Sequence, residues 1–154
     1  MPSLEDLAHS IENAGRILAH WIGASTHDQL VAVPSLGDFS RCRSGYAIAA
    51  EVVEANRGIA ARLRQEEPAP RGTTTFDSVE AASRAVLESA GALADVVRGL
   101  TPEALTRVYQ VPFGQIPGAA LMALAANHMY YHGGQINYIQ RLYGDEEFSL
   151  PPSG

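Results

Sequence analysis

The apolar positions of this chain repeat with helical periodicity in four separate stretches. In each stretch they recur every three or four residues, which places them on one face of an α-helix. The four predicted helices span residues 3–23, 44–65, 77–100 and 118–142. We expect Ser3 to cap the first helix, Gly23 to end it, and Gly144 to cap the last. Each helix then has an apolar face to bury against the others.

The connections between the predicted helices are irregular. Residues 24–43 contain Pro34, Gly37 and several short polar side chains, so we expect a long connection with at most one turn of helix. Prolines and a glycine break the chain again within residues 68–72. Residues 101–117 predict a short helical turn at 101–105, and residues 107–111 are the only strand candidate, isolated between turn signals.

These patterns predict an all-α fold with one domain over residues 1–154. Four helices of about 20 residues, each with one apolar face, are typical of a four-helix bundle. A long connection between the first and second helices permits a crossover, so these two need not be hairpin neighbours.

Three polar residues interrupt the apolar face of the last helix. His128 and His132 are four positions apart and Gln135 follows three positions later, so their side chains project from one face. Each polar group buried without a partner costs roughly 1–3 kcal/mol, so the fold must satisfy them. Two imidazoles at this spacing can bind one metal ion. The alternative is a buried pair that is satisfied by hydrogen bonds alone.

A further ligand must come from another helix, and Glu51 is the best candidate. It lies on the shoulder of the apolar face of the second helix, whereas Glu54 points further towards solvent. The alternative for Glu51 is a solvated residue beside that face. Because Cys42 is the only cysteine, a disulfide within the chain and every multi-cysteine metal site are excluded. A metal would therefore be held by histidine and carboxylate.

Charge and hydropathy exclude other classes of function. Seventeen acidic residues outnumber eleven basic ones, which are scattered, so we expect no nucleic-acid partner. No run approaches 18 apolar residues and the first residues lack a signal-peptide pattern, so we expect a cytoplasmic protein that does not enter a membrane. All eleven basic residues are arginine, which is typical of a GC-rich bacterial genome.

Several residues near the polar trio have two interpretations. Gly133 and Gly134 each cost about 0.8–1 kcal/mol relative to alanine inside a helix, so we expect close packing against a helix or a dimer mate, or clearance for a substrate. Tyr131 lies close enough to the histidine face to line a pocket, although packing is the usual role of such an aromatic residue. Asn56 is expected to satisfy buried backbone groups.

The pattern His128-x-x-x-His132-x-Gly134-Gln135-Ile136, together with residues 48–56 of the second helix, resembles the DinB-like metalloenzymes. The resemblance covers nearly the whole chain. It implies a bundle of up-down-down-up topology, a homodimer, and a divalent metal held by three histidines, two of which match His128 and His132. Glu51 stands where the family has the third histidine. A carboxylate there keeps three ligands but changes their charge from neutral to −1, so nickel, zinc and iron all remain candidates.

The resemblance implies an enzyme with a small-molecule substrate that the sequence does not identify. The expected activity is a metal-dependent transferase, which uses a thiol, or a hydrolase. No catalytic base is identifiable, and Gln135 is a candidate to orient a ligand or a bound water. The alternative is a non-catalytic dimeric binding or scaffold protein whose site has lost its metal.

Overall fold

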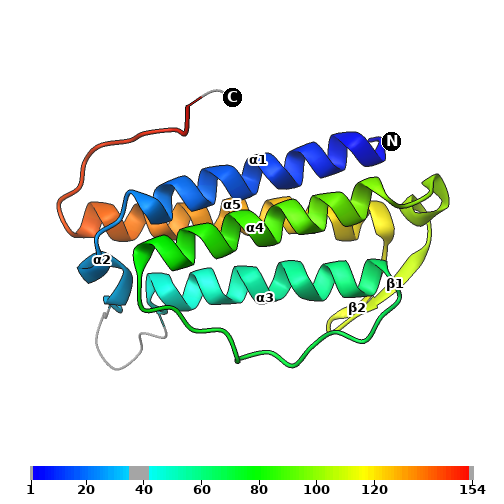
Figure 1. Ribbon diagram of the computed structural model, residues 1–154, viewed down its shortest axis with the longest axis horizontal. Helices are drawn as coiled ribbons and strands as arrows, with labels where there is room; N and C mark the ends of the chain where they lie inside the picture. The colour runs from blue at the N-terminus through cyan, green and yellow to red at the C-terminus, as the bar shows by residue number, and fades with distance from the viewer. Residues whose placement is uncertain (1, 35–41, 153–154) are drawn as a thin grey trace.

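Four long helices make up most of the computed structural model, which describes residues 2–34 and 42–152. They are α1 (Leu4–Gly23), α3 (Gly45–Leu63), α4 (Val79–Arg98) and α5 (Gly118–Leu142). The four lie side by side along the longest dimension of the molecule (Figure 1). α1 packs against α4 and α5, and α3 packs against the same two helices. The chain is therefore mostly helical, as predicted.

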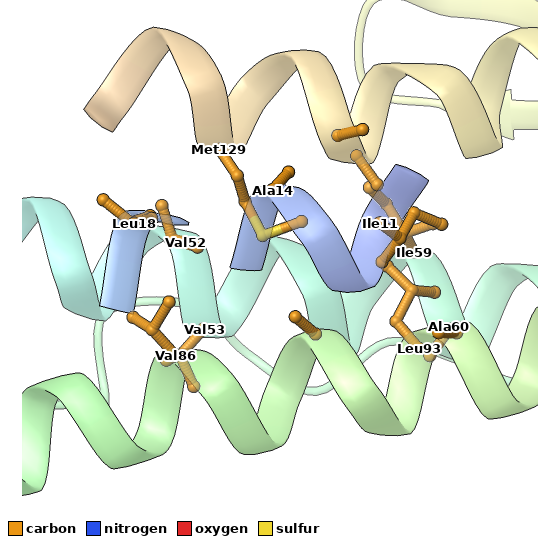
Figure 2. Packing of buried hydrophobic residues seen from close by; sticks show 14 of the residues in the cluster. Ile11, Ala14, Leu18, Val52, Val53, Ile59, Ala60, Val86, Leu93 and Met129 are labelled. Carbon is orange, nitrogen blue, oxygen red and sulfur yellow. The ribbon is translucent and has the colours of Figure 1, made fainter. Parts of the chain in front are cut away.

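The helices enclose one apolar core. Figure 2 shows side chains from all four helices meeting in it, among them Leu18 of α1, Val52 of α3, Val86 of α4 and Met129 of α5. All four side chains are fully buried. These residues belong to the periodic apolar positions of the sequence, apart from Met129, which lies beside His128. Burial of this shared face is what holds α3 and α5 next to each other.

The helix limits follow from local capping chemistry. Ser3 accepts a hydrogen bond from the Asp6 amide while the Asp6 carboxylate accepts one from the Ser3 amide, so α1 begins with a capping box. Ser44 and Ser78 cap α3 and α4 in the simpler one-bond manner. Gly144 has a φ of +83° just beyond α5, the left-handed conformation expected of a glycine that ends a helix. The predicted limits are correct to within about two residues.

The connections contain two short helical elements and one hairpin. The helix α2 (His27–Val31) supplies the single turn expected in the first connection, and the 3-10 helix η1 (Pro102–Leu105) forms where a turn was predicted. The strand β1 (Val108–Val111) pairs antiparallel with β2 (Gly114–Pro117). The sequence prediction missed this hairpin, because Gly114 and Pro117 at the two ends of β2 are residue types typical of turns. Gly37, expected in the first connection, lies outside the described residues.

A long loop, residues 64–78, joins α3 to α4. In Figure 1 it runs back along the length of α3 before α4 begins. It brings its middle residues next to α3, close to the part of the helix that carries Glu51 and Glu54. None of the helices in the described part of the chain is both long enough and apolar enough to cross a membrane.

Candidate metal centre

Glu51, His128 and His132 meet between α3 and α5. His128 and His132 are one turn apart on α5, and Glu51 lies in the second turn of α3, which packs against α5. The His132 Nε2 atom is 3.0 Å from His128 Nε2 and 4.0 Å from Glu51 Oε2. One ligand atom from each of the three residues lies within 4.8 Å of the other two. The structure thus brings together the three residues that the sequence predicted as ligands.

The distances within this cluster fit a metal ion. Two atoms that both bind an ion at about 2.0–2.2 Å can be at most about 4.4 Å apart, and the two distances from His132 Nε2 meet this limit. His128 Nδ1 is buried without a hydrogen-bond partner within the described structure, and Glu51 Oε2 has an ion pair with Arg43 but no hydrogen bond from the other two residues. A buried nitrogen without a partner is costly, so hydrogen bonding within the cluster leaves it incomplete.

Gln135 determines which nitrogen of His132 is available. The Gln135 Oε1 atom lies 2.7 Å from His132 Nδ1, and with the amide assigned in this orientation Nδ1 donates its hydrogen to the carbonyl oxygen. The lone pair of His132 is then on Nε2, which faces His128 and Glu51. A hydrogen bond of this kind orients a metal-binding imidazole and selects its tautomer.

Both imidazoles are held in the neutral form. Burial, followed by the neighbouring His132 and the charge of Arg71, lowers the pKa of His128 from 6.5 to about 4. Burial also lowers the pKa of His132, against the opposing effect of its bond to Gln135, and the charge of Arg43 adds to the lowering. Because only neutral imidazole binds a metal, both side chains are ready ligands at pH 7 without losing a proton.

The sequence analysis missed one partner of the site, Arg43. Its Nη1 atom makes an ion pair with Glu51 Oε2. The Arg43 side chain is 57% exposed, while that of Glu51 is 27% exposed and that of His132 is 7% exposed. Arg43 lies two residues before α3 begins, so helical periodicity could not place it. It provides the nearest positive charge to the carboxylate in the described structure.

The other residues singled out near the trio take different positions. Tyr131 is 65% exposed and its ring makes an edge contact with His132, at a centroid distance of 5.2 Å, so it lies at the surface beside the site. Gly133 packs against Trp21, where an added Cβ would lie 2.8 Å from a ring carbon. No atom lies within 4 Å of a Cβ built on Gly134. Within this chain, the expected close packing is therefore found at Gly133 and not at Gly134.

One other prediction for α3 is wrong, and a second gains a detail from the structure. Asn56 is fully buried but it does not satisfy backbone groups; its Nδ2 donates to Ser89 Oγ at 3.1 Å and contacts Met129 Sδ at 3.5 Å. Glu54 was expected to point further towards solvent than Glu51, and the structure adds that its carboxylate accepts hydrogen bonds from three backbone amides of residues 72–74. These bonds lower the pKa of Glu54 below its ordinary value. Glu54 therefore fastens the long loop to α3, one turn from Glu51.

Comparisons with known proteins agree on one family. A family model described as the DinB family matches residues 3–151. A solved structure of a DinB-like protein from Bacillus cereus has a TM-score of 0.75, with 17% identity over 97% of each chain. A DinB-like protein from Bacillus subtilis has a TM-score of 0.72, with 17% identity over 94% of this chain and 95% of the other. No curated protein matches the chain.

Proposed function

Because this chain belongs to the DinB family, we propose that it binds a divalent metal ion through Glu51, His128 and His132. The observation that carries the proposal is the convergence of three donor side chains from two helices, each with a ligand atom within 4.8 Å of the other two. Neutral histidines and an ionised carboxylate are the donors that divalent transition metals take. The bond from Gln135 to His132 supports the same interpretation.

The donor set restricts the metal to a class. Two imidazoles and one carboxylate carry a total charge of −1 and suit zinc, iron or nickel. A bound ion would supply Lewis acidity, lowering the pKa of a water or thiol at its open position. The chain's own residues would prepare the site for the ion. Gln135 fixes the tautomer of His132, and burial keeps both histidines neutral. The partly exposed side chain of Glu51 leaves the site accessible from solvent.

The activity we propose is a metal-dependent transferase, which uses a thiol, or a hydrolase that acts on a small molecule in the cytoplasm. Family membership supports it, together with an acidic chain without a clustered basic surface, which disfavours nucleic acid as the substrate. We also propose that the four long helices form an up-down-down-up bundle that pairs as a homodimer. The return loop between α3 and α4 supports this topology, because a loop that runs back along α3 starts α4 in the same direction.

One observation favours a second candidate, a binding or scaffold protein without a metal. Arg43 already neutralises Glu51, and the chain of contacts from Gln135 through His132 to His128 satisfies part of the polar group. In that case the cluster would be a polar network that specifies how α3 and α5 pack. His128 Nδ1 then stays buried without a hydrogen bond, which is the cost of this alternative.

Metal analysis separates the two candidates. The protein should be purified without a histidine tag, analysed for transition metals, and then incubated with nickel, zinc or iron before excess metal is removed. We expect close to one equivalent per chain after incubation, and none in a His128→Gln/His132→Gln variant. Less than about 0.1 equivalent in the wild-type protein, before and after incubation, would favour the metal-free candidate.

A further inference from the structure

Two arginines from separate segments flank the candidate metal centre. Arg43 precedes α3 and pairs with Glu51. Arg71 belongs to the long loop between α3 and α4, directly before the amides that bond to Glu54, and its charge adds to the lowering of the pKa of His128. Arg71 takes part in none of the ion pairs among residues 2–34 and 42–152. One of the two guanidinium groups is therefore bound to a metal-ligand candidate, and the other has no carboxylate partner in that part of the chain.

The position of Arg71 is fixed by the backbone beside it. The amides of Gly72, Thr73 and Thr74 donate to the Glu54 carboxylate at 2.8, 2.9 and 2.8 Å. Glu54 and Glu51 are three residues apart on α3, which places them on neighbouring turns of one side of the helix. The three bonds thus hold the residue next to Gly72 over the part of α3 that carries the site. These bonds keep the backbone of residue 71 beside the part of α3 that carries Glu51.

The local charge around the candidate centre differs from that of the whole chain. The protein has a net charge of −6. Around the site, the positive charges of Arg43 and Arg71 balance the negative charges of Glu51 and Glu54, and a divalent ion would add two positive charges. An anion that diffuses to the protein is therefore repelled less here than by the acidic remainder, and it would be attracted to this place with the ion bound.

We propose that Arg43 and Arg71 form an anion-binding rim beside the metal centre, and that the substrate is a small molecule bearing a carboxylate. In this scheme Arg43 exchanges partners. It pairs with Glu51 while the ion is absent and turns to the substrate when the ion takes the Glu51 carboxylate. The role of the rim in catalysis rests on the proposed metal-dependent function, but the rim itself does not need the metal.

The chemistry of arginine supports this assignment. A guanidinium group presents a planar fork of donors that matches a carboxylate, and it keeps its charge at all ordinary pH values. The Arg43 side chain is 57% exposed, so its end can leave Glu51 without crossing the core. Arg43 has a carboxylate partner both before and after the exchange, so no guanidinium charge is left unpaired.

The test uses succinate as the probe and calorimetry as the measurement, first without metal. Glu51→Gln removes the internal partner of Arg43 while keeping the shape of the side chain. We expect metal-free Glu51→Gln to bind succinate about tenfold more tightly than the metal-free wild-type protein. Adding Arg43→Gln or Arg71→Gln to Glu51→Gln should remove that gain. Arg64→Gln serves as the matched control, because Arg64 pairs with Glu66 about 20 Å further along α3.

Two outcomes overturn the rim. One is equal binding of succinate by Glu51→Gln and by its double variant with Arg43→Gln. The other is binding of the neutral succinamide as tightly as succinate. A second arm loads the wild-type protein with zinc, and there we expect succinate to bind about tenfold more tightly than without zinc. If no zinc binds, but Glu51→Gln binds succinate more tightly and this gain depends on both arginines, the rim is supported and the metal-dependent function is rejected. If zinc binds, but Glu51→Gln gives no such gain, the metal site is supported and the rim is rejected.

Discussion

The two neighbouring glycines of α5 should respond in opposite ways to the same substitution. A Cβ on Gly133 would lie 2.8 and 3.0 Å from two ring carbons of Trp21, closer than carbon atoms can approach. Trp21 cannot simply step aside, because its Nε1 donates to the Ser149 carbonyl at 2.8 Å and its ring packs on Phe148. A Cβ on Gly134 meets nothing within 4 Å. Helix propensity alone then decides the effect at Gly134.

The magnitudes follow from these two environments. Overpacking costs about 1–3 kcal/mol, and alanine regains about 0.8–1 kcal/mol of helix propensity. We therefore expect Gly133→Ala to lower the free energy of unfolding by about 1 kcal/mol and Gly134→Ala to raise it by a similar amount. The difference of about 2 kcal/mol corresponds to roughly 1 M in the urea midpoint if the slope is near 2 kcal/mol per M.

Urea unfolding followed by circular dichroism measures both variants. A Trp21→Leu background provides the control, because the penalty of Gly133→Ala should disappear once the ring is gone. Equal stabilisation by both alanines would refute the packing argument. Destabilisation by Gly134→Ala that depends on protein concentration would show that a second copy covers this glycine, and the open space seen in the single chain would then be occupied in the dimer.

Three further predictions concern the site and the loop beside it. The pKa of His128, about 4 when folded against 6.5 when unfolded, means that the unfolded chain binds more protons between these values. The metal-free protein should therefore lose stability as pH falls from 6.5 to 4, by about 1–2 kcal/mol after solvent screening of this partly exposed group, and urea midpoints across that range measure it. Glu54→Gln should speed amide exchange at residues 72–74 without altering the exchange of the α4 core, because only the loop loses a charged acceptor. Gln135→Leu should weaken metal binding 10- to 100-fold by calorimetry, whereas Gln135→Glu, which keeps an acceptor for His132 Nδ1, should preserve it.

The helices were predictable because each carries its own local information. Ser3, Ser44 and Ser78 mark three beginnings by capping chemistry, and the apolar spacing marks the length that follows. The hairpin was not predictable in the same way. Its second strand, Gly114–Pro117, is four residues long and has a glycine and a proline at its ends, so only pairing with Val108–Val111 makes it a strand.

The residues of the candidate site also fall into a predictable and an unpredictable group. His128, His132 and Gln135 share one face of a helix by their spacing, and Glu51 lies beside the apolar face of the second helix. Helical periodicity therefore allowed the sequence to predict these four residues as one site. Arg43 precedes its helix and Arg71 lies in a long loop, where no periodicity relates them to the site. Their positions depend on the ion pair with Glu51 and on the loop contacts of Glu54, which are tertiary interactions.

The most direct test of the account is metal-dependent stability of the wild-type protein beside a His128→Gln/His132→Gln variant. A ligand that binds only the folded state at 100 times its Kd stabilises by about 2.7 kcal/mol. In a chain of this size that raises Tm by roughly 5–10 °C. We expect zinc, nickel or iron to produce such a shift in the wild-type protein and none in the variant. An equal shift in both proteins, or no shift in either, would contradict a metal centre at Glu51, His128 and His132.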